Sequence, residues 1–272
     1  MWWMRPQGPY GNGARVSTVV EPVAVANPVL RRRGTGEILL VAVCAMGYSV
    51  LCFLAPVLPS TAFRHAREVL AVEKALGIDV ELDLNLWLHA HPLLANIAST
   101  FYAFSFFVVT FGALALLWLR RPDRYAYARN TLFVMTAGAM VTYWTFPLAP
   151  PRLLTTLGYV DAVANQAGVG AGYSRATATL ANQYGAMPSM HTGWAVWSAL
   201  VLGLFVWKRW WQRLLLAIHP VFTVWVIIAT ANHYVLDALA GASYCAVALV
   251  ACAAMAGTLS PAPAPVPALE RA

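Results

Sequence analysis

The chain has 272 residues, of which 60% are hydrophobic and 11% are charged, and its formal net charge is +7 at pH 7. With a mean hydropathy of +0.62, this composition excludes an ordinary soluble globular domain and indicates an integral membrane protein. A positive charge also occurs in nucleic-acid-binding proteins, but here the clustered basic residues lie in loops between apolar segments, so no nucleic-acid partner is expected.

Six largely uncharged windows are candidates for membrane-spanning helices, because a helix needs about 20 apolar residues to cross a bilayer. In chain order they are residues 38–58, 93–119, 130–148, 191–207, 214–232 and 234–258. A signal peptide is an alternative for the first window, but its apolar stretch is longer than such peptides usually have. We therefore predict an all-α fold in which six transmembrane helices form a bundle in the lipid bilayer.

The clustered basic residues occupy alternate loops between these windows. They are Arg31, Arg32 and Arg33 before the first window, Arg120, Arg121, Arg124 and Arg129 between the second and third, and Lys208, Arg209 and Arg213 between the fourth and fifth. The positive-inside rule places these loops and both termini in the cytoplasm. Segments 59–92 and 149–190 and a short turn near Asn232 then lie on the extracytoplasmic side. The Arg-, Ala- and Trp-rich usage favours a bacterial plasma membrane.

The two ends of the chain differ in composition from its middle. Residues 1–36 mix Pro, Gly, Asn and Arg without periodicity and are expected to form a disordered cytoplasmic tail. Residues 259–272 are rich in Pro and Ala and are expected to form a second cytoplasmic tail. Residues 37–258 then form the membrane domain. Its four cysteines all fall inside the windows and include no CxxC pair, so no disulfide is expected.

The segment after the first window has an amphipathic pattern. In TAFRHAREVLAVEKAL, residues 61–76, most apolar side chains fall on one side of a helical wheel, with Glu73 as the charged exception. This pattern predicts a helix lying in the membrane interface. The next stretch, residues 78–88, alternates apolar and polar residues as a strand does, although a single strand would have no partner. The pair His89 and His91 suits a turn better than a metal site.

Two histidines and one aspartate lie at the outer ends of the predicted helices. His233 and Asp237 are four residues apart, so we expect both on one face of the sixth helix. A carboxylate inside a membrane is costly, and Asp237 would accept a hydrogen bond from one ring nitrogen of His233, leaving the other as a nucleophile. His191, which begins the fourth helix, would supply a general acid at the same depth.

The residues around these histidines favour an anionic ligand. A helix that starts at Ser189 and Met190 presents backbone N–H groups beside the Ser189 hydroxyl, and such helix starts bind phosphate. Arg152 would add a bidentate cation, and Arg175, in the same glycine-rich segment, is a further candidate. Each residue alone also suits an ordinary packing or surface role, as we expect for His219. Their convergence at one membrane face is what predicts a phosphate site.

The sequence resembles the type 2 phosphatidic acid phosphatase (PAP2) superfamily of membrane phosphatases and phosphotransferases. PSMH, residues 188–191, is similar to the family motif PSGH, and HYVLD, residues 233–237, is similar to the H-x-x-x-D end of its third motif. The resemblance spans roughly residues 38–258. It implies that His233 becomes a phosphohistidine, that Asp237 orients it and that His191 protonates the leaving oxygen. It also implies phosphate binding by Ser189 and the adjacent backbone, and no metal or other cofactor.

The sequence departs from the family motifs at four further positions, two of which are basic in the family. With Arg152 as the arginine of the first motif, K-x6-R-P, the lysine position is Thr145 and the proline position is Leu153. In the third motif, S-R-x5-H, the serine and arginine positions are Val226 and Ile227. The stretches PLAPPR and NHYVLDALAG are similar instead to the branch that includes inositol phosphorylceramide synthases, which transfer a phosphoinositol head group to a lipid alcohol.

We therefore expect a metal-independent lipid phosphatase or phosphotransferase that acts on a phospholipid or polyprenyl phosphate at the extracytoplasmic face. An inositol phosphorylceramide synthase-like head-group transferase is the alternative within this chemistry. A site with two histidines and one carboxylate could also bind a metal, but Ser189 and Arg152 would then lack a role. A transporter or lipid-binding scaffold is a further alternative, although the two halves show no convincing repeat.

Overall fold

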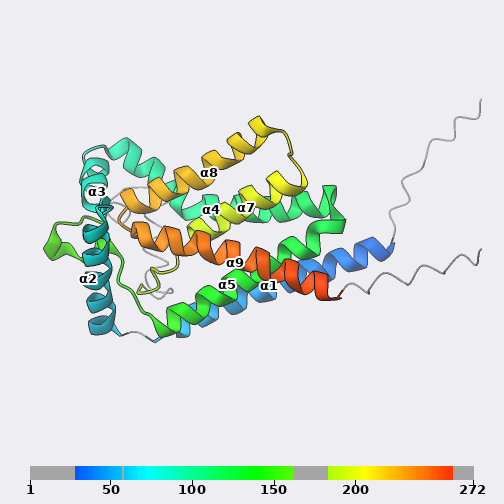
Figure 1. Ribbon diagram of the computed structural model, residues 1–272, viewed down its shortest axis with the longest axis horizontal. Helices are drawn as coiled ribbons and strands as arrows, with labels where there is room; N and C mark the ends of the chain where they lie inside the picture. The colour runs from blue at the N-terminus through cyan, green and yellow to red at the C-terminus, as the bar shows by residue number, and fades with distance from the viewer. Residues whose placement is uncertain (1–27, 57, 162–182, 260–272) are drawn as a thin grey trace, which may run out of the picture. The chain divides into compact units, whose positions relative to one another are not determined.

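A computed structural model of the chain describes residues 28–56, 58–161 and 183–259 (Figure 1). Its α-helices are α1 (Pro28–Leu54), α2 (Pro59–Leu76), α3 (Glu81–His89), α4 (Pro92–Arg120), α5 (Pro122–Thr145), α7 (Met190–Phe205), α8 (Trp210–Ala229) and α9 (Val235–Leu259), with short 3-10 turns η1 (Pro151–Leu153) and η2 (Thr155–Leu157). The described residues contain no strand, so the all-α prediction is confirmed. The chain forms two units, Met1–Ala42 and Val43–Ala272, and the candidate site belongs to the second.

The predicted strand over residues 78–88 is wrong, because most of this stretch forms α3. The residues that α3 buries are Glu81, Asn85 and Leu88, whose spacing of four and three places them on one side of a helix. The alternation of apolar and polar residues therefore did not indicate the helix, because two of the residues on its buried face are polar.

Four helical segments are long and apolar enough to cross a membrane, namely Gly34–Leu54, Pro92–Arg120, Trp210–Ala229 and Val235–Met255. The prediction of an integral membrane protein therefore holds, and the prediction of six spans is supported for four helices. The 24 residues of α5 include Asp123, Arg124 and Arg129 near its start, and α7 has only 16 residues. That α5 and α7 also cross the membrane stays a prediction.

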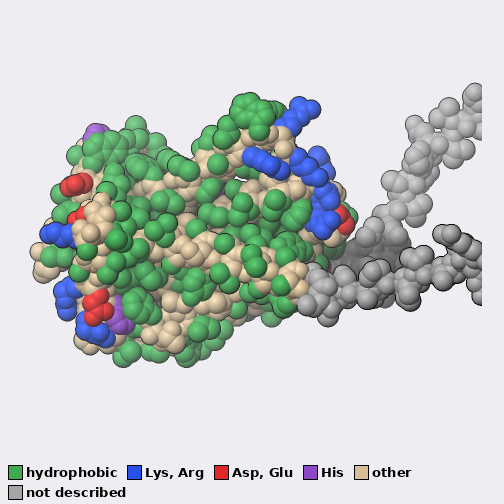
Figure 2. Space-filling view, viewed as in Figure 1, with side chains coloured by type: hydrophobic (Ala, Val, Ile, Leu, Met, Phe, Trp, Pro, Cys, Tyr) green, Lys and Arg blue, Asp and Glu red, His purple; other side chains and the backbone are tan. Residues whose placement is uncertain are grey.

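Two of the three loops that carry clustered basic residues, the one between α4 and α5 and the one between α7 and α8, lie together in the second unit. Nη1 of Arg121, at the start of α5, donates to the Phe205 carbonyl at the end of α7 (2.7 Å), and Nε of Arg213 donates to the Gly203 carbonyl (3.1 Å). Figure 2 shows Lys and Arg side chains at both ends of the visible face, with the larger group at one end, and mainly hydrophobic side chains between the two ends. Both loops therefore lie at the C-terminal end of α7, and that this end faces the cytoplasm stays a prediction.

The short helix α7 lies at the centre of the second unit, where it packs against α4, α5, α8 and α9. An apolar helix that is surrounded by other helices has buried residues on all sides, and α7 buries Trp194, Trp197 and Val201. Trp197 is fully buried, and its indole N–H donates to the Ala128 carbonyl (3.1 Å) and the Thr131 hydroxyl (2.9 Å). The start of α7, which carries His191, is therefore held by a tightly packed core.

Helices α7 and α9 cross closely because small residues lie at the crossing. A Cβ atom on Gly241 would overlap the Ser189 carbonyl oxygen, and a Cβ atom on Gly193 would lie 3.2 Å from the Gly241 carbonyl oxygen. Small residues allow helix backbones to approach in this way inside membranes. At the same crossing the Ser189 N–H donates to the Asp237 carbonyl (2.9 Å). The glycines thereby bring the two sequence motifs together.

Replacing Gly241 with Ala is expected to destabilise the protein, because the new methyl group would push the start of α7 away from α9. Overpacking of this kind costs about 1–3 kcal/mol. Thermal unfolding of the purified protein in detergent should give a lower midpoint for Gly241→Ala than for wild type. Gly112→Ala in α4 is the matched control, because a Cβ there would meet nothing within 4 Å. Equal midpoints for the two variants would show that the close crossing is not needed.

Helix α2 directs its buried face toward other parts of the protein. The buried residues are Ala62, His65, Ala66, Val69 and Glu73, and α2 contacts α9. Figure 1 shows α2 crossing the N-terminal end of α9 at a steep angle. His65 stacks on Phe146 with ring centroids 4.1 Å apart, and its Nδ1 lies 2.8 Å from the Pro147 carbonyl oxygen. That α2 also lies in a membrane interface stays a prediction.

Candidate active site

His233 lies in the turn between α8 and α9. The prediction that it shares a face of the last helix with Asp237 is wrong in this respect, because α9 begins only at Val235. Asp237 Oδ2 accepts a hydrogen bond from the Tyr234 N–H (3.0 Å) and so caps the start of the helix. The same oxygen lies 3.3 Å from His233 Nδ1. The spacing of four residues therefore still brings the two side chains together, through a helix cap.

The protonation pattern of His233 follows from its neighbours. Nδ1 lies 2.8 Å from the Ala186 carbonyl oxygen as well as 3.3 Å from Asp237 Oδ2. Both neighbours are acceptors, so the neutral ring carries its hydrogen on Nδ1 and has its lone pair on Nε2. The side chain is 6% exposed, which limits the orientations the ring can adopt. The chemistry available to His233 is therefore attack through Nε2.

The turn that carries His233 is strained at Ala231. Its φ of 55° lies in the left-handed region, which residues other than glycine rarely adopt. The Ala231 N–H donates to the Ile228 carbonyl (2.8 Å), and the Ala231 carbonyl accepts from the Arg152 N–H (2.8 Å). Strained backbone of this kind persists only where its surroundings hold it, and it is common at functional sites.

His191 lies in the first turn of α7, facing His233. The centroids of the two imidazole rings are 5.8 Å apart. His191 also stacks on Tyr102 of α4 at 4.3 Å with an interplanar angle of 18°, and it contacts Phe106 at 4.3 Å. These two aromatic residues hold the imidazole in place and were not identified from the sequence, where they are part of an apolar run.

Ser189 and Met190 hold structural positions at the start of α7. Ser189 is fully buried, and its hydroxyl oxygen accepts from the N–H and the hydroxyl of Thr192 at 3.4 Å each, as a helix N-cap does. The Met190 side chain is 5% exposed and belongs to the hydrophobic core. Binding of phosphate by the Ser189 hydroxyl and the backbone at Met190 stays a prediction. The contacts of Ser189 make it first of all a cap for α7.

Arg152 reaches the turn that carries His233. Nη1 donates to the side-chain oxygen of Asn232 at 2.7 Å, and Nε lies 3.6 Å from Asp161 Oδ2. Asn232 directly precedes His233, and its amide group donates to the Thr230 hydroxyl (2.9 Å). The structure therefore joins Arg152 to the turn that carries His233 through Asn232, a polar neighbour of the motif that sequence reasoning did not single out. Arg175 lies outside the described residues.

The positions where the family motifs have additional basic residues carry no charge in this protein. The Thr145 hydroxyl donates to the Val141 carbonyl (2.9 Å), and Val226 and Ile227 are fully buried apolar residues of α8. Leu153 packs against the hydrophobic cluster that contains the buried apolar residues of α2. Among these motif positions, positive charge is therefore limited to Arg152, which Asp161 partly balances.

The described residues include no group of three or more His, Cys, Asp or Glu arranged to hold a metal ion. Asp237 contacts His233 at Nδ1, so it acts as a partner of that histidine and does not point with both histidines toward a common centre. The geometry of the described part therefore gives no support to the alternative of a site with two histidines and one carboxylate.

Comparison of the sequence with known protein families gives a match. A family model for the PAP2 superfamily matches residues 67–254. The chain belongs to the PAP2 superfamily. Searches of curated proteins and of solved structures gave no match. The matched range runs from the middle of α2 through most of α9 and includes His191, His233 and Asp237. In this PAP2 protein the residues of the two motifs are thus the ones that the structure brings together.

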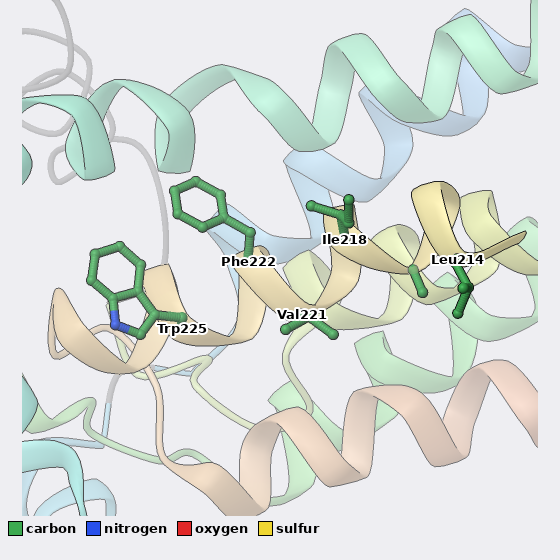
Figure 3. A pocket seen from close by; sticks show the side chains of 6 residues that line it. Leu214, Ile218, Val221, Phe222 and Trp225 are labelled. Carbon is green, nitrogen blue, oxygen red and sulfur yellow. The ribbon is translucent and has the colours of Figure 1, made fainter. Parts of the chain in front are cut away.

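A separate apolar groove lies along α8 (Figure 3). It is lined by Leu214, Ala217, Ile218, Val221, Phe222 and Trp225. The side chains of Phe222 and Trp225 stack on each other with ring centroids 5.4 Å apart. None of the lining residues is a candidate site residue of the PAP2 motifs, and all are apolar. The groove therefore suits contact with lipid chains but not the chemistry of phosphate.

Replacing Arg152 with Lys is expected to lower the rate of phosphoryl transfer from a lipid phosphate about tenfold, because lysine keeps the charge but lacks the planar fork. Arg152→Ala should lower the rate further. Release of phosphate or head group from lipid vesicles is the measurement. Arg64→Lys is the matched control, because Arg64 is exposed and contacts Glu68 and His65 of its own helix α2. A wild-type rate for Arg152→Lys would contradict bidentate binding.

Proposed function

We propose that the protein is an integral-membrane lipid phosphatase or phosphotransferase that forms a phosphohistidine at His233. Its substrate is the phosphate group of a phospholipid or polyprenyl phosphate, presented at the extracytoplasmic face, and the reaction needs no metal. The observation that carries this proposal is the pair of imidazoles. The rings of His191 and His233 lie 5.8 Å apart, and His233 is held through Nδ1 with its Nε2 lone pair left for attack.

The geometry suits a reaction in two steps. In the first, Nε2 of His233 forms a bond to phosphorus while the bond from phosphorus to the leaving oxygen breaks, and His191 donates a proton to that oxygen. Asp237 stabilises the positive charge that develops on the His233 ring. In the second step, His191 takes a proton from an incoming hydroxyl group, which bonds to phosphorus and releases His233. Water as the acceptor gives hydrolysis, and an alcohol gives transfer.

The limited positive charge favours a phosphodiester over a phosphomonoester. A phosphodiester carries one negative charge, whereas a monoester at neutral pH carries nearly two. Among the described residues at the motif positions, Arg152 is the cation, and Asp161 lies 3.6 Å from it. Such a site stabilises one negative charge better than two. This observation favours a second candidate function, the transfer of a phosphodiester-linked head group to a lipid alcohol, as in inositol phosphorylceramide synthases.

An aromatic surface next to His191 supports a lipid substrate. Phe107 and Phe111 of α4 are 37% and 36% exposed and contact Trp194 of α7 with ring centroids 6.2 and 6.3 Å apart. Phe106, which contacts His191, also contacts Trp194 (5.5 Å). The aromatic side chains thus continue from the imidazole along a membrane-spanning helix. A lipid phosphate at His191 would have its chains against this surface.

The test is turnover of a lipid panel by purified protein in detergent with a chelator present. Phosphatidic acid, a polyprenyl diphosphate and phosphatidylinositol represent a monoester, a diphosphate and a phosphodiester. His233→Ala is expected to lower turnover by a factor of about 10³ or more, and His191→Ala by a factor of about 10² or more. His89→Ala, at an exposed position at the end of α3, is the control and should retain the wild-type rate.

The products separate the two candidate functions. Free phosphate from phosphatidic acid or the diphosphate would establish a phosphatase, and a new head-group conjugate formed with an added lipid alcohol would establish a transferase. Intact-protein mass spectrometry of wild type during turnover should show a covalent phosphoryl adduct that is absent from His233→Ala. Turnover that survives in His233→Ala would remove the phosphohistidine mechanism.

A further inference from the structure

Two buried glutamates bind the first turn of α9. Glu73 Oε1, from α2, accepts from the Leu236 N–H (2.7 Å), and Glu81 Oε1, from α3, accepts from the Val235 N–H (3.0 Å). Both side chains are fully buried. Val235 and Leu236 are the first two residues of α9, and His233 lies just before them. Glu73, the charged residue on the apolar face of α2, thus accepts a hydrogen bond from the first turn of α9, the helix that follows His233.

The contacts of these two glutamates create a charge problem. A carboxylate at a helix N-terminus is favourable, because it binds free N–H groups at the positive end of the dipole. Here, however, Asp237 already caps the same turn, and the second oxygens of all three carboxyl groups are buried without a hydrogen-bond partner among the described residues. The desolvation and mutual repulsion of three adjacent buried charges would cost far more free energy than the interaction with the helix dipole supplies.

One proton shared by Glu73 and Glu81 removes this conflict. Two carboxyl groups at neighbouring amides can keep both contacts to α9 if a proton lies between their second oxygens. Burial, together with the nearby Glu81 and Asp237 carboxyl groups, raises the pKa of Glu73 to about 8. The other titratable groups that face the pair are Tyr159, after η2, and Tyr234, with His233 behind Asp237. None of these groups supplies a permanent positive charge.

We propose that Glu73 and Glu81 are positioning residues of the reaction, which share one proton and hold the first turn of α9 so that Asp237 and His233 keep the orientation needed for attack. The inference rests on the proposed role of His233 as nucleophile. Neither glutamate touches the reacting atoms. Each acts through the backbone of the helix that carries Asp237.

Asn85 binds the other side of the turn that carries His233. We call the contacts of Glu73, Glu81 and Asn85 to the two ends of this turn the brace. The amide group of Asn85 donates to the carbonyl of Ala229, the last residue of α8, at 3.1 Å, and to the Val160 carbonyl at 3.0 Å. Its oxygen accepts from the Val160 N–H at 2.8 Å. Glu81 and Asn85 lie one helical turn apart on the buried face of α3, so this face contacts both ends of the turn that carries His233. Val160 also precedes Asp161, the partner of Arg152.

The shared proton makes the brace sensitive to alkaline pH. The pKa of Glu73 in the folded protein lies above that of an exposed glutamate, so the folded protein binds more protons than the unfolded protein across this interval. Stability contributed by the pair is therefore fully present in acid and is lost as pH rises through about 8. Above this range two adjacent charges repel, the contacts to Val235 and Leu236 weaken, and His233 loses its fixed position.

Substitution by glutamine separates proton sharing from packing. In Glu73→Gln the amide oxygen still accepts from Leu236, and the amide nitrogen permanently supplies the hydrogen that the shared proton provides. We expect Glu73→Gln and Glu81→Gln to keep kcat near neutral pH within about twofold and to lose the alkaline decline that wild type shows. Glu73→Ala should lower kcat about 10- to 100-fold at every pH with little change in KM, because small displacements of a catalytic group cost rates of this order.

Glu68→Gln is the matched control, since Glu68 lies on the exposed side of α2 and pairs with Arg64. It should keep both the wild-type rate and the wild-type pH profile. The thermal unfolding midpoint in detergent gives a second readout that does not depend on turnover. The midpoint of wild type should fall as pH rises through about 8, and the midpoint of Glu73→Gln should not.

The outcomes distinguish this inference from the proposed function. A pH profile of Glu73→Gln that superimposes on wild type, or equal losses in the Gln and Ala variants at every pH, would overturn proton sharing. A wild-type kcat in Glu73→Ala would overturn positioning. Absence of both turnover and the phosphoryl adduct in wild type would overturn the proposed function and the positioning role with it, and the midpoints would then decide proton sharing alone.

Discussion

The start of α9 is a buried helix terminus whose free N–H groups have to be satisfied without water. Three consecutive amides, those of Tyr234, Val235 and Leu236, each donate to a carboxyl oxygen, from Asp237, Glu81 and Glu73 respectively. An unsatisfied N–H in such a place costs about 1–3 kcal/mol, so the three acceptors fix where α9 begins. Because the acceptors come from α9, α3 and α2, the same interaction also fixes the segment between α1 and α4 against the site.

The position of His191 follows from a second constraint at the same helix. The glycines at the crossing let the start of α7 approach α9 until the Ser189 N–H reaches the Asp237 carbonyl. Asp237 thus takes part in both halves of the site, through its side chain to His233 and through its backbone to the helix that carries His191. The backbone contact between Ser189 and Asp237 thus joins the two segments whose imidazoles lie 5.8 Å apart.

Sequence reasoning singled out the groups that we propose react, with Asp237 as the partner of His233, but it missed the other residues that hold them. His191, His233 and Asp237 stand out because titratable side chains are rare at the ends of apolar helices. The amphipathic pattern of α2 gave its helical form, yet a period of 3.6 residues cannot tell whether the apolar face meets lipid or protein. Glu73 was a visible signal, because a charge on an apolar face needs a partner, but the partner was an amide more than 160 residues away in the chain.

The misread stretch 78–88 has a related cause. Its acidic residues and Asn85 made the stretch alternate as a strand does, whereas Glu81 and Asn85 are the polar residues that α3 buries. Buried polar residues that bind backbone groups have no hydropathy signature, since only the acceptors and donors of distant segments explain them. Tyr102 and Phe106 were missed for the opposite reason, because apolar residues that hold an imidazole look the same as residues that face lipid.

The distribution of charge around His233 bears on the chemistry that we propose. Carboxyl groups gather behind the nucleophile, where they favour a positively charged imidazole, and the front of the site has Arg152 partly balanced by Asp161. Stabilisation of the attacking histidine therefore exceeds attraction of the phosphate. For the lipid substrate that we propose, the membrane would bring the substrate to the site, because a lipid held by its chains needs little electrostatic attraction to reach it. For the reaction that we propose, the aromatic surface beside His191 would favour an alcohol that arrives from the bilayer over water as the second reactant.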